Sequence, residues 1–153
     1  MSYKQIRGGI KKYTRDGRSP IPNKIATSRV MSANRGINTK PEIIFRHQLL
    51  KRGMNGYRLH WHVSGRPDIA FVSKKVAIFV NGCFWHRCPR CKNPLPKTHK
   101  AFWQHKFTAN RLRDKRNTAL LKQAGWKVLT MWECELEENI DRAMRAVKRA
   151  LSA

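Results

Sequence analysis

The chain has 153 residues, a length that favours one compact domain with room for a short tail. Its 33 Lys and Arg residues against nine Asp and Glu residues give a formal net charge of +24. This charge predicts a polyanionic partner, with nucleic acid first, although a merely basic protein or one that binds anionic lipid has the same composition. The sequence has no run of about 18 apolar residues and no apolar signal core, which argues against a membrane span and predicts a cytoplasmic, nucleoid-associated protein.

Acidic residues are scarce, and their positions are therefore informative. Five of the nine acids lie between Glu133 and Asp141, and the other four are spread over the preceding chain. A surface that binds DNA disfavours carboxylates because they repel phosphate. Glu42, Asp68 and Asp114 are therefore candidates for metal binding or proton transfer. The alternative is that each of them caps a helix or pairs with an Arg.

The N-terminal region is basic, polar and interrupted by glycine and proline as far as Pro22. We interpret residues 1–24 as a flexible arm and residues 25–153 as the folded domain. An arm of this composition either tracks phosphates and lies in a groove of DNA or has little consequence. Residues 25–34, IATSRVMSAN, are expected to form a short helix on binding.

The first helix is predicted to begin at Thr39-Lys40-Pro41-Glu42. Thr39 suits the N-cap, Pro41 fits the first turn, and Glu42 completes a capping box. Gly53 is expected to end this helix. Glu42 therefore has a structural explanation as well as a functional one.

Three strands are expected next, at residues 57–62, 67–72 and 76–80, with a hairpin turn at residues 73–75. Asp68 stands at the start of the second strand, in an apolar stretch that includes Ile69 and Phe71. Asp is disfavoured in strands, and a buried charge must be paired or bind a metal. Asp68 is therefore a candidate functional residue.

The second half of the chain predicts a loop at residues 82–100, a helix at 101–123, a strand at 126–132 and an amphipathic helix at 135–151. The long helix has an uneven apolar stripe that includes Phe102, Phe107 and Leu112. Asn110 and Asp114 share a face of it because they lie four residues apart. A strand, a helix and a further strand predict a right-handed crossover between parallel strands. The predicted fold class is α/β, with a mixed β-sheet flanked by helices.

The four cysteines fit one metal site. Cys83, Cys88 and Cys91 follow a C-x4-C-x2-C pattern, and Cys134 follows the last strand. Four thiolates satisfy a tetrahedral zinc ion without an open position, which is typical of a structural site. His86 competes as a ligand because mixed Cys and His sites are common, and free thiols are the other alternative.

A closed zinc site does no chemistry, so Asp68 requires a different metal. A carboxylate with backbone oxygens and waters suits Mg²⁺. In phosphodiester hydrolysis such an ion orients water and stabilises the leaving oxygen. His86 is then free to act as a general base, since histidine titrates close to neutral pH.

These residues resemble a known family. The segment GRPDIAFVSKKVAIFVNGCFWHRC is similar to the core of the very short patch repair (Vsr) DNA mismatch endonucleases. The segments TSRVMSANRGINTKPE, FWQHKFTANRLRD and AGWKVLTMWEC agree with the same family in the same order. The resemblance runs from residue 25 to residue 140 and implies a restriction-endonuclease-like PD-(D/E)XK core with a structural zinc site.

The resemblance also implies roles for individual residues. The implied ligands of a catalytic Mg²⁺ are the carboxylate of Asp68 and the backbone carbonyl of Val80, and those of a structural Zn²⁺ are Cys83, Cys88, Cys91 and Cys134. The implied catalytic residues are His86, which activates the attacking water, and its supporting residues Glu42, Asn110 and Asp114. The implied DNA-binding residues are the aromatic wedge Phe84, Trp85 and Trp103, together with Arg29, Met31 and Arg113.

Asn81 departs from the family pattern, in which Thr-His or Val-Asp often stands where this chain has Val80-Asn81. Asn cannot shuttle a proton as His can, so a hydrogen bond to phosphate or to a metal-bound water is its expected catalytic role. Some members also use His in place of Cys88, with a different spacing to the next ligand. Residues 1–24 have no clear counterpart in the family.

The resemblance implies a Mg²⁺-dependent enzyme that nicks one strand of double-stranded DNA beside a T·G mismatch, of the kind left by deamination of 5-methylcytosine. We expect a monomer with a functional link to a cytosine-5 DNA methyltransferase. Two alternatives are a zinc-stabilised DNA-binding protein without nuclease activity and a related nuclease with site or structure specificity. The rare acids favour a nuclease over a pure binding protein, which has no need of Asp68 and Asp114 in so basic a chain.

Overall fold

The computed structural model describes residues 36–97 and 99–152. Its elements follow the predicted order, and their bounds are α2 (Lys40–Lys51), β1 (Arg58–Leu59), β2 (Ile69–Phe71), the 3-10 turn η2 (Val72–Lys74), β3 (Val76–Asn81), α3 (Lys100–Gln123), β4 (Lys127–Trp132) and α4 (Glu133–Ser152). The arm and the short helix expected before residue 35 lie outside the described residues. Within the described ranges no helix is long and apolar enough to cross a membrane.

The sheet has the strand order β1-β2-β3-β4. The first three strands form an antiparallel meander, in which Ile69 of β2 pairs with Ile78 of β3. β3 and β4 run parallel, with Ile78 opposite Leu129, and α3 connects them. The mixed sheet predicted from the sequence is therefore confirmed, because the strand, helix and strand of the second half form a parallel crossover unit.

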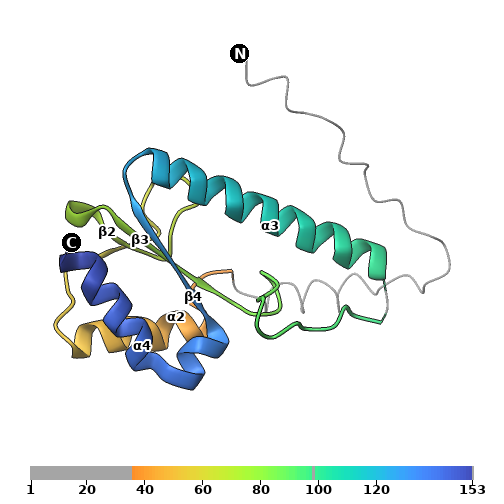
Figure 1. The fold of residues 1–153 in the computed structure, drawn as a ribbon, viewed down its shortest axis with the longest axis horizontal. Coiled ribbons are helices and arrows are strands. Elements are labelled where there is room, and N and C mark those ends of the chain that lie inside the picture. The colour runs from red at the N-terminus through yellow and green to blue at the C-terminus, as the bar shows by residue number, and fades with distance from the viewer. Residues whose placement is uncertain (1–35, 98, 153) are drawn as a thin grey trace, which may run out of the picture.

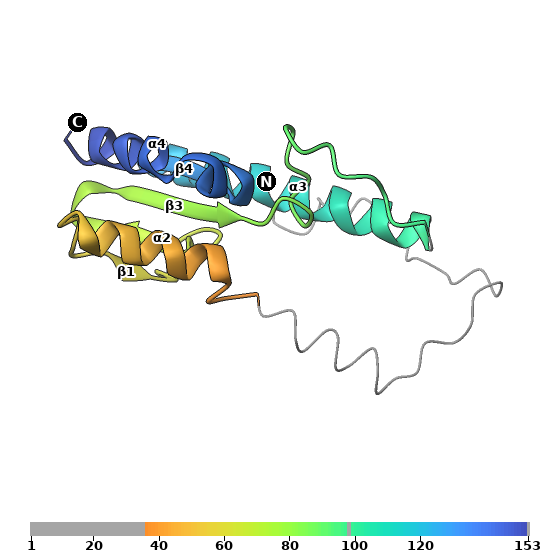
Figure 2. The ribbon, with the colours of Figure 1, turned by 90° about the horizontal axis from the view of Figure 1, so that it is seen from below.

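Helices cover both faces of the sheet. Figure 1 shows α2 and α4 together on one side of the strands and α3 along the other side. The turned view in Figure 2 agrees, and both views show the N-terminal part of α3 extending past the sheet toward the loop that follows β3. This overhang brings α3 and the loop together beside the ends of β3 and β4.

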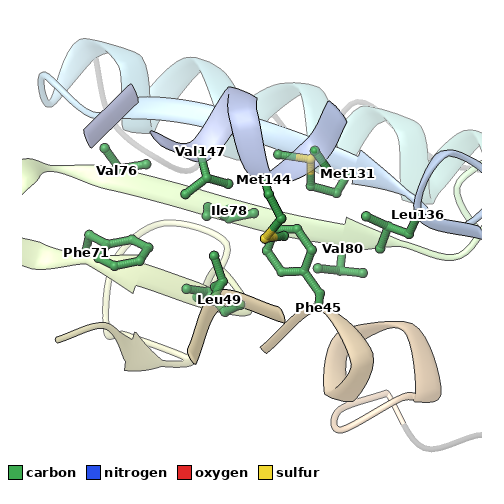
Figure 3. Packing of buried hydrophobic residues seen from close by; sticks show 12 residues of the cluster. Phe45, Leu49, Phe71, Val76, Ile78, Val80, Met131, Leu136, Met144 and Val147 are labelled. Atoms are coloured by element: carbon green, nitrogen blue, oxygen red, sulfur yellow. The ribbon is translucent and has the colours of Figure 1, made fainter. Parts of the chain in front are cut away.

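The main core lies between the sheet and the pair α2–α4. The alternating residues Val76, Ile78 and Val80 of β3 are buried, as the two-residue period of a strand requires. Figure 3 shows them facing α2 and α4, whose buried contributions include Phe45 and Met144. Because this packing fixes the alternation of β3, its other residues, including Asn81, face the side of the sheet that α3 covers.

Several expected bounds are wrong. The strand predicted at residues 57–62 is limited to Arg58–Leu59, because His60 adopts a left-handed backbone with φ of 48°. The last helix begins two residues earlier than predicted and is interrupted at Asn139, which has a non-helical φ of −156°. The Oδ1 atom of Asn139 accepts a hydrogen bond from the backbone N–H of Arg142 at 3.0 Å, so Asn139 caps the second part of α4.

The apolar stripe expected on α3 is confirmed only in part. Phe107 and Leu121 are buried, whereas Leu112 is 60% exposed and Leu120 is 43% exposed. Only the C-terminal part of α3 lies over the sheet, and its N-terminal part packs against the loop through aromatic rings instead. The long polar remainder of α3 borders a cleft.

Candidate active site

A cleft of about 1020 Å³ opens where β3 and β4 end and β2 begins. The acids on its walls come from four separate elements, and they are Glu42, Asp68, Asp114 and Glu133. Asp68 precedes β2, which is antiparallel to β3, so it lies at the carboxyl end of the two parallel strands. Ligands of open α/β sheets bind outside the carboxyl ends of the strands. The fold therefore collects the rare acids of the chain at a site suited to a ligand.

Asp68 lies at the floor of this cleft. Its Oδ2 atom accepts a hydrogen bond of 2.7 Å from the backbone N–H of Val80. The pKa of Asp68 is raised to about 6, mainly because the carboxyl is buried; the Val80 hydrogen bond lowers this pKa, and the nearby charge of Glu42 raises it. A half-buried carboxylate beside a second acid is satisfied by a proton or by a cation. Asp68 therefore has the environment of a metal ligand.

Glu42 caps α2 and borders the same cleft. Its Oε1 atom accepts hydrogen bonds from the hydroxyl and the backbone N–H of Thr39, at 2.6 and 3.3 Å, and its Oε2 atom accepts one from the backbone N–H of Asn38 at 2.9 Å. The residue is only 4% exposed. The capping explanation is thus confirmed, and the cap also fixes a negative charge close to Asp68.

His86 and Asp114 form an ion-pair geometry across the cleft. The Nδ1 atom of His86, in the loop after β3, lies 2.6 Å from Oδ2 of Asp114 on α3. One turn earlier on the same helix face, the side-chain N–H of Asn110 donates to the backbone carbonyl of Trp85 at 3.1 Å. Two residues of α3 therefore hold the loop and orient the imidazole of His86.

The donors around Asp68 fit a hard divalent cation. The carboxylate, the neighbouring backbone and the polar side chain of Asn81 offer oxygen atoms, and Mg²⁺ prefers oxygen ligands together with water. Bound there, Mg²⁺ would supply charge stabilisation and orientation for phosphodiester hydrolysis. A cation site at Asp68 that faces the imidazole of His86, itself oriented by Asp114, is an arrangement able to activate water.

The four cysteines form one cluster on the other side of the loop. Their sulfur atoms all lie within 4.8 Å of one another, and the Sγ atoms of Cys88 and Cys134 are 3.8 Å apart. A tetrahedral zinc ion with Zn–S bonds of about 2.3 Å requires sulfur pairs about 3.8 Å apart. The backbone N–H of Cys134 also donates to Sγ of Cys83 at 3.4 Å, as expected around zinc thiolates. The cluster is therefore a plausible zinc site, and His86 lies outside it.

The cysteine cluster is tied to the cleft through Glu133. This residue lies between β4 and Cys134, and its Oε2 atom accepts a hydrogen bond from the backbone N–H of Cys83 at 3.2 Å. On the outer side, Arg90 pairs with Glu138 at 2.6 Å. The loop that contains His86 is thus anchored to the start of α4 at several points.

Aromatic rings pack together at the N-terminal part of α3, and two of them, Phe84 and Trp85, line the cleft. Phe84 is central, with ring centroids 5.2 Å from Trp85, 5.5 Å from Trp103 and 5.2 Å from Phe107. Phe107 is buried, whereas Phe84, Trp85 and Trp103 are half-buried. The guanidinium of Arg87 lies 4.9 Å from the centre of the Phe107 ring. The three predicted wedge residues are therefore held as one partly exposed platform.

The structure brings most of the sequence-predicted site residues together. Glu42, Asp68, Val80, Asn81, His86, Asn110, Arg113 and Asp114 all line the cleft, as do Phe84 and Trp85. Arg113 is exposed, with its Nε atom 3.9 Å from Oδ1 of Asp114. Arg29 and Met31 lie outside the described residues.

The residues of the cleft wall that sequence reasoning missed include His60, Lys106 and Glu133. Glu133 directly follows a strand and precedes a cysteine, a position that places it at the carboxyl edge of the sheet. Lys106 precedes the buried Phe107 on α3. His60 has no comparable signal, because its position depends on the left-handed backbone that ends β1.

Comparison with known proteins agrees with this site. A family model described as DNA mismatch endonuclease Vsr matches residues 20–92. The type II nicking enzyme V.NaeI of Lentzea aerocolonigenes is 40% identical over 136 residues, which cover 86% of this chain and 80% of that protein. The type II nicking enzyme V.XorIIP of Xanthomonas oryzae pv. oryzae is 41% identical over 110 residues, covering 71% of this chain and 80% of that protein.

The DNA mismatch endonuclease Vsr of Escherichia coli K12 is also similar, with 40% identity over 83 residues that cover 52% of this chain and 53% of that protein. The segment matched by the family model contains Glu42, Asp68 and His86 and three of the four cysteines. The chain therefore belongs to the Vsr DNA mismatch endonuclease family and is a strand-nicking DNA endonuclease.

Proposed function

We propose that this enzyme nicks one strand of duplex DNA beside a T·G mismatch, such as deamination of 5-methylcytosine leaves. The observation that carries the mismatch preference is the aromatic platform of Phe84, Trp85 and Trp103 next to the acidic cleft. Apolar wedges enter DNA by unstacking bases, at a cost of a few kcal/mol per step. A wobble pair is easier to unstack than a matched pair, so such a platform favours a mismatch.

Asp68 and the backbone carbonyl of Val80 would hold Mg²⁺, which when bound supplies charge stabilisation at the scissile phosphate. The remaining chemistry belongs to the side chains. His86 accepts a proton from the attacking water at Nε2 while Nδ1 stays paired with Asp114. Asn110 positions the loop through the carbonyl of Trp85, and Glu42 fixes the start of α2 beside the site. Asn81 contributes a hydrogen bond to phosphate or water.

The four cysteines would hold Zn²⁺ in a structural role. The short distances between their sulfur atoms support this role, because four thiolates leave no open position for substrate. Zinc then stabilises the loop that contains Phe84, Trp85 and His86.

DNA is the substrate that the family implies, and we propose that it is double-stranded; the net charge of +24 suits such a polyanion. We propose that the enzyme acts as a monomer on cytoplasmic, nucleoid DNA. A functional link to a cytosine-5 DNA methyltransferase follows from the proposed lesion. Arg113 and, in the arm region, Arg29 and Met31 are proposed to contact the DNA.

A second candidate function is nicking at a specific site without a mismatch. Relatives that match most of the chain are type II nicking enzymes, which favours this alternative. A zinc-stabilised DNA-binding protein without nuclease activity is disfavoured by the family and by the conjunction of Asp68, His86 and Asp114 in one cleft.

The deciding experiment is a nicking assay on end-labelled duplexes. T·G, T·C and fully matched pairs are placed in a set of sequence contexts, and each strand is labelled separately. The proposal predicts a single nick on the strand that contains the mismatched T, at a rate far above that of the matched duplex. Equal nicking of matched and T·G duplexes in one context would replace mismatch recognition by site recognition.

A further inference from the structure

His60 is a second histidine on the wall of the cleft. It directly follows β1, and its backbone N–H points to the carbonyl oxygen of Asp68 at 3.5 Å. Among the described residues that line the cleft, only His60 and His86 have an imidazole. His60 is also close enough to Asp68 to lower the pKa of the Asp68 carboxyl. This effect is smaller than the effect of burial, which raises the same pKa. The imidazole is therefore part of the surroundings of Asp68.

Two features of His60 are unfavourable for the stability of the fold. Its backbone has a φ of 48°, in the left-handed region that residues with a Cβ rarely adopt. Its Nε2 atom is buried and has no hydrogen-bond partner among the described residues. Strain and an unsatisfied buried polar atom in one residue are typical of functional sites, where a ligand or an ordered water supplies the missing partner.

The size of the missing partner follows from the burial. Nε2 is closed to bulk solvent, so a large group such as a DNA base does not reach it, and a single ordered water is the smallest partner that would satisfy it. The imidazole of His86 is already hydrogen-bonded to Asp114, and the side chain of Asn81 is an amide and not an imidazole. His60 is therefore the one imidazole among the described cleft residues whose buried nitrogen lacks a partner.

We propose that His60 is a positioning residue of the divalent-cation site at Asp68, and that its Nε2 atom hydrogen-bonds a water held between the imidazole and that site. The proposal rests on the Mg²⁺ site of the proposed function, and it is independent of mismatch preference. Residues that hold the surroundings of a metal site in this way affect metal affinity by roughly 10- to 100-fold when they are replaced. The expected role of His60 is thus in ion affinity, with DNA contact left to other residues.

The test measures Mn²⁺ binding to the zinc-saturated full chain by the loss of the free-ion electron paramagnetic resonance signal. The variants are His60→Gly, His60→Gln and, as a matched control, His62→Gly, which replaces an exposed histidine of the same loop. Glycine suits the left-handed backbone at residue 60, so His60→Gly removes the imidazole without adding strain. Asp68→Ala defines the background without the site, and circular dichroism confirms that each variant is folded.

The proposal predicts that His60→Gly weakens Mn²⁺ binding by roughly 10- to 100-fold, that His60→Gln weakens it less, and that His62→Gly leaves it unchanged. Saturating Mg²⁺ should then restore nicking by His60→Gly on any duplex that the wild type cuts. Wild-type Mn²⁺ affinity in His60→Gly would overturn the proposal. Unchanged Mn²⁺ binding in Asp68→Ala would instead contradict the cation site of the proposed function, so the two failures are distinguishable.

Discussion

His86 Nδ1 and Asp114 Oδ2 are 2.6 Å apart, although the two residues come from a loop and from the middle of a long helix. A carboxylate at Nδ1 fixes the orientation of a neutral imidazole and leaves Nε2 able to accept a proton. The same helix face holds the loop through Asn110 and the carbonyl of Trp85. α3 therefore supports both the position and the tautomer of the proposed base.

Asp114→Asn should lower the single-turnover nicking rate by about 100-fold or more, because the amide neither fixes the imidazole tautomer nor stabilises the imidazolium that forms. The matched control is Asp141→Asn. Asp141 lies on α4, away from the cleft, and its carboxylate pairs with Arg52. Nicking rates of the two variants under saturating Mg²⁺ check this expectation. Equal rates for Asp114→Asn and wild type would remove the pair from the mechanism.

Asp68→Asn should stabilise the metal-free protein at pH 8. The pKa of Asp68 is about 6 in the fold against its ordinary value of 3.8, so folding favours the protonated form. The ionised carboxylate therefore destabilises the fold above pH 6, by at most about 3 kcal/mol, and this penalty disappears as the pH falls below about 4. Thermal melts in a chelator of Mg²⁺ should show a gain for Asp68→Asn at pH 8 that shrinks toward pH 4.5.

Added Mg²⁺ should reverse this order at pH 8. Wild type gains stability because the ion binds the folded state, whereas Asp68→Asn gains little. A melting temperature of Asp68→Asn that is raised equally at all pH values would show that the burial of Asp68 is not the cause.

Zinc analysis of the purified chain should find about one ion per molecule, held against mild chelators. Cys88→Ser and Cys134→Ser should each lose the ion and several kcal/mol of stability, since metal binding contributes directly to folding. Nicking should be lost with the zinc, because the loop with Cys83 also contains His86 and is tied to Glu133. A zinc-free preparation with full activity would contradict the cluster assignment.

Trp85→Leu should reduce the preference for T·G over matched duplex by roughly tenfold, since stacking of a base on an aromatic ring contributes about 1–3 kcal/mol. Trp126→Leu is the control, because Trp126 precedes β4 at the opposite end of the sheet. The comparison of nicking rates on both duplexes isolates preference from overall activity. If Trp85→Leu and Trp126→Leu reduce the preference for T·G equally, the cause is a loss of protein stability and the stacking role of Trp85 is contradicted.

The order of elements and the mixed sheet follow from the hydrophobic periodicity and from the glycines between elements. Gly53 ends α2 and Gly125 precedes β4, and both have a positive φ. The bounds were less predictable. β1 ends at Leu59 because of a single backbone angle at His60, and α4 is interrupted by the extended backbone of Asn139. Neither backbone angle can be predicted from the pattern of apolar and polar residues.

The candidate site was predictable where residue type alone was unusual. Asp68 in an apolar strand and four cysteines in a basic chain stand out without any structure. Glu133 and His60 do not, since one lies in an acidic run and the other in a segment rich in His and Trp. Their place in the cleft depends on the parallel pairing of β3 with β4 and on the turn after β1.

The most direct test of the account is single-turnover nicking of a labelled T·G duplex by wild type and Asp68→Ala in Mg²⁺, with binding of the same duplex measured in parallel. The account predicts that Asp68→Ala binds the duplex nearly as well as wild type, because the carboxylate contributes no attraction to phosphate, and that it produces no nick. Nicking of the T·G strand by Asp68→Ala at a rate close to that of wild type would contradict the account.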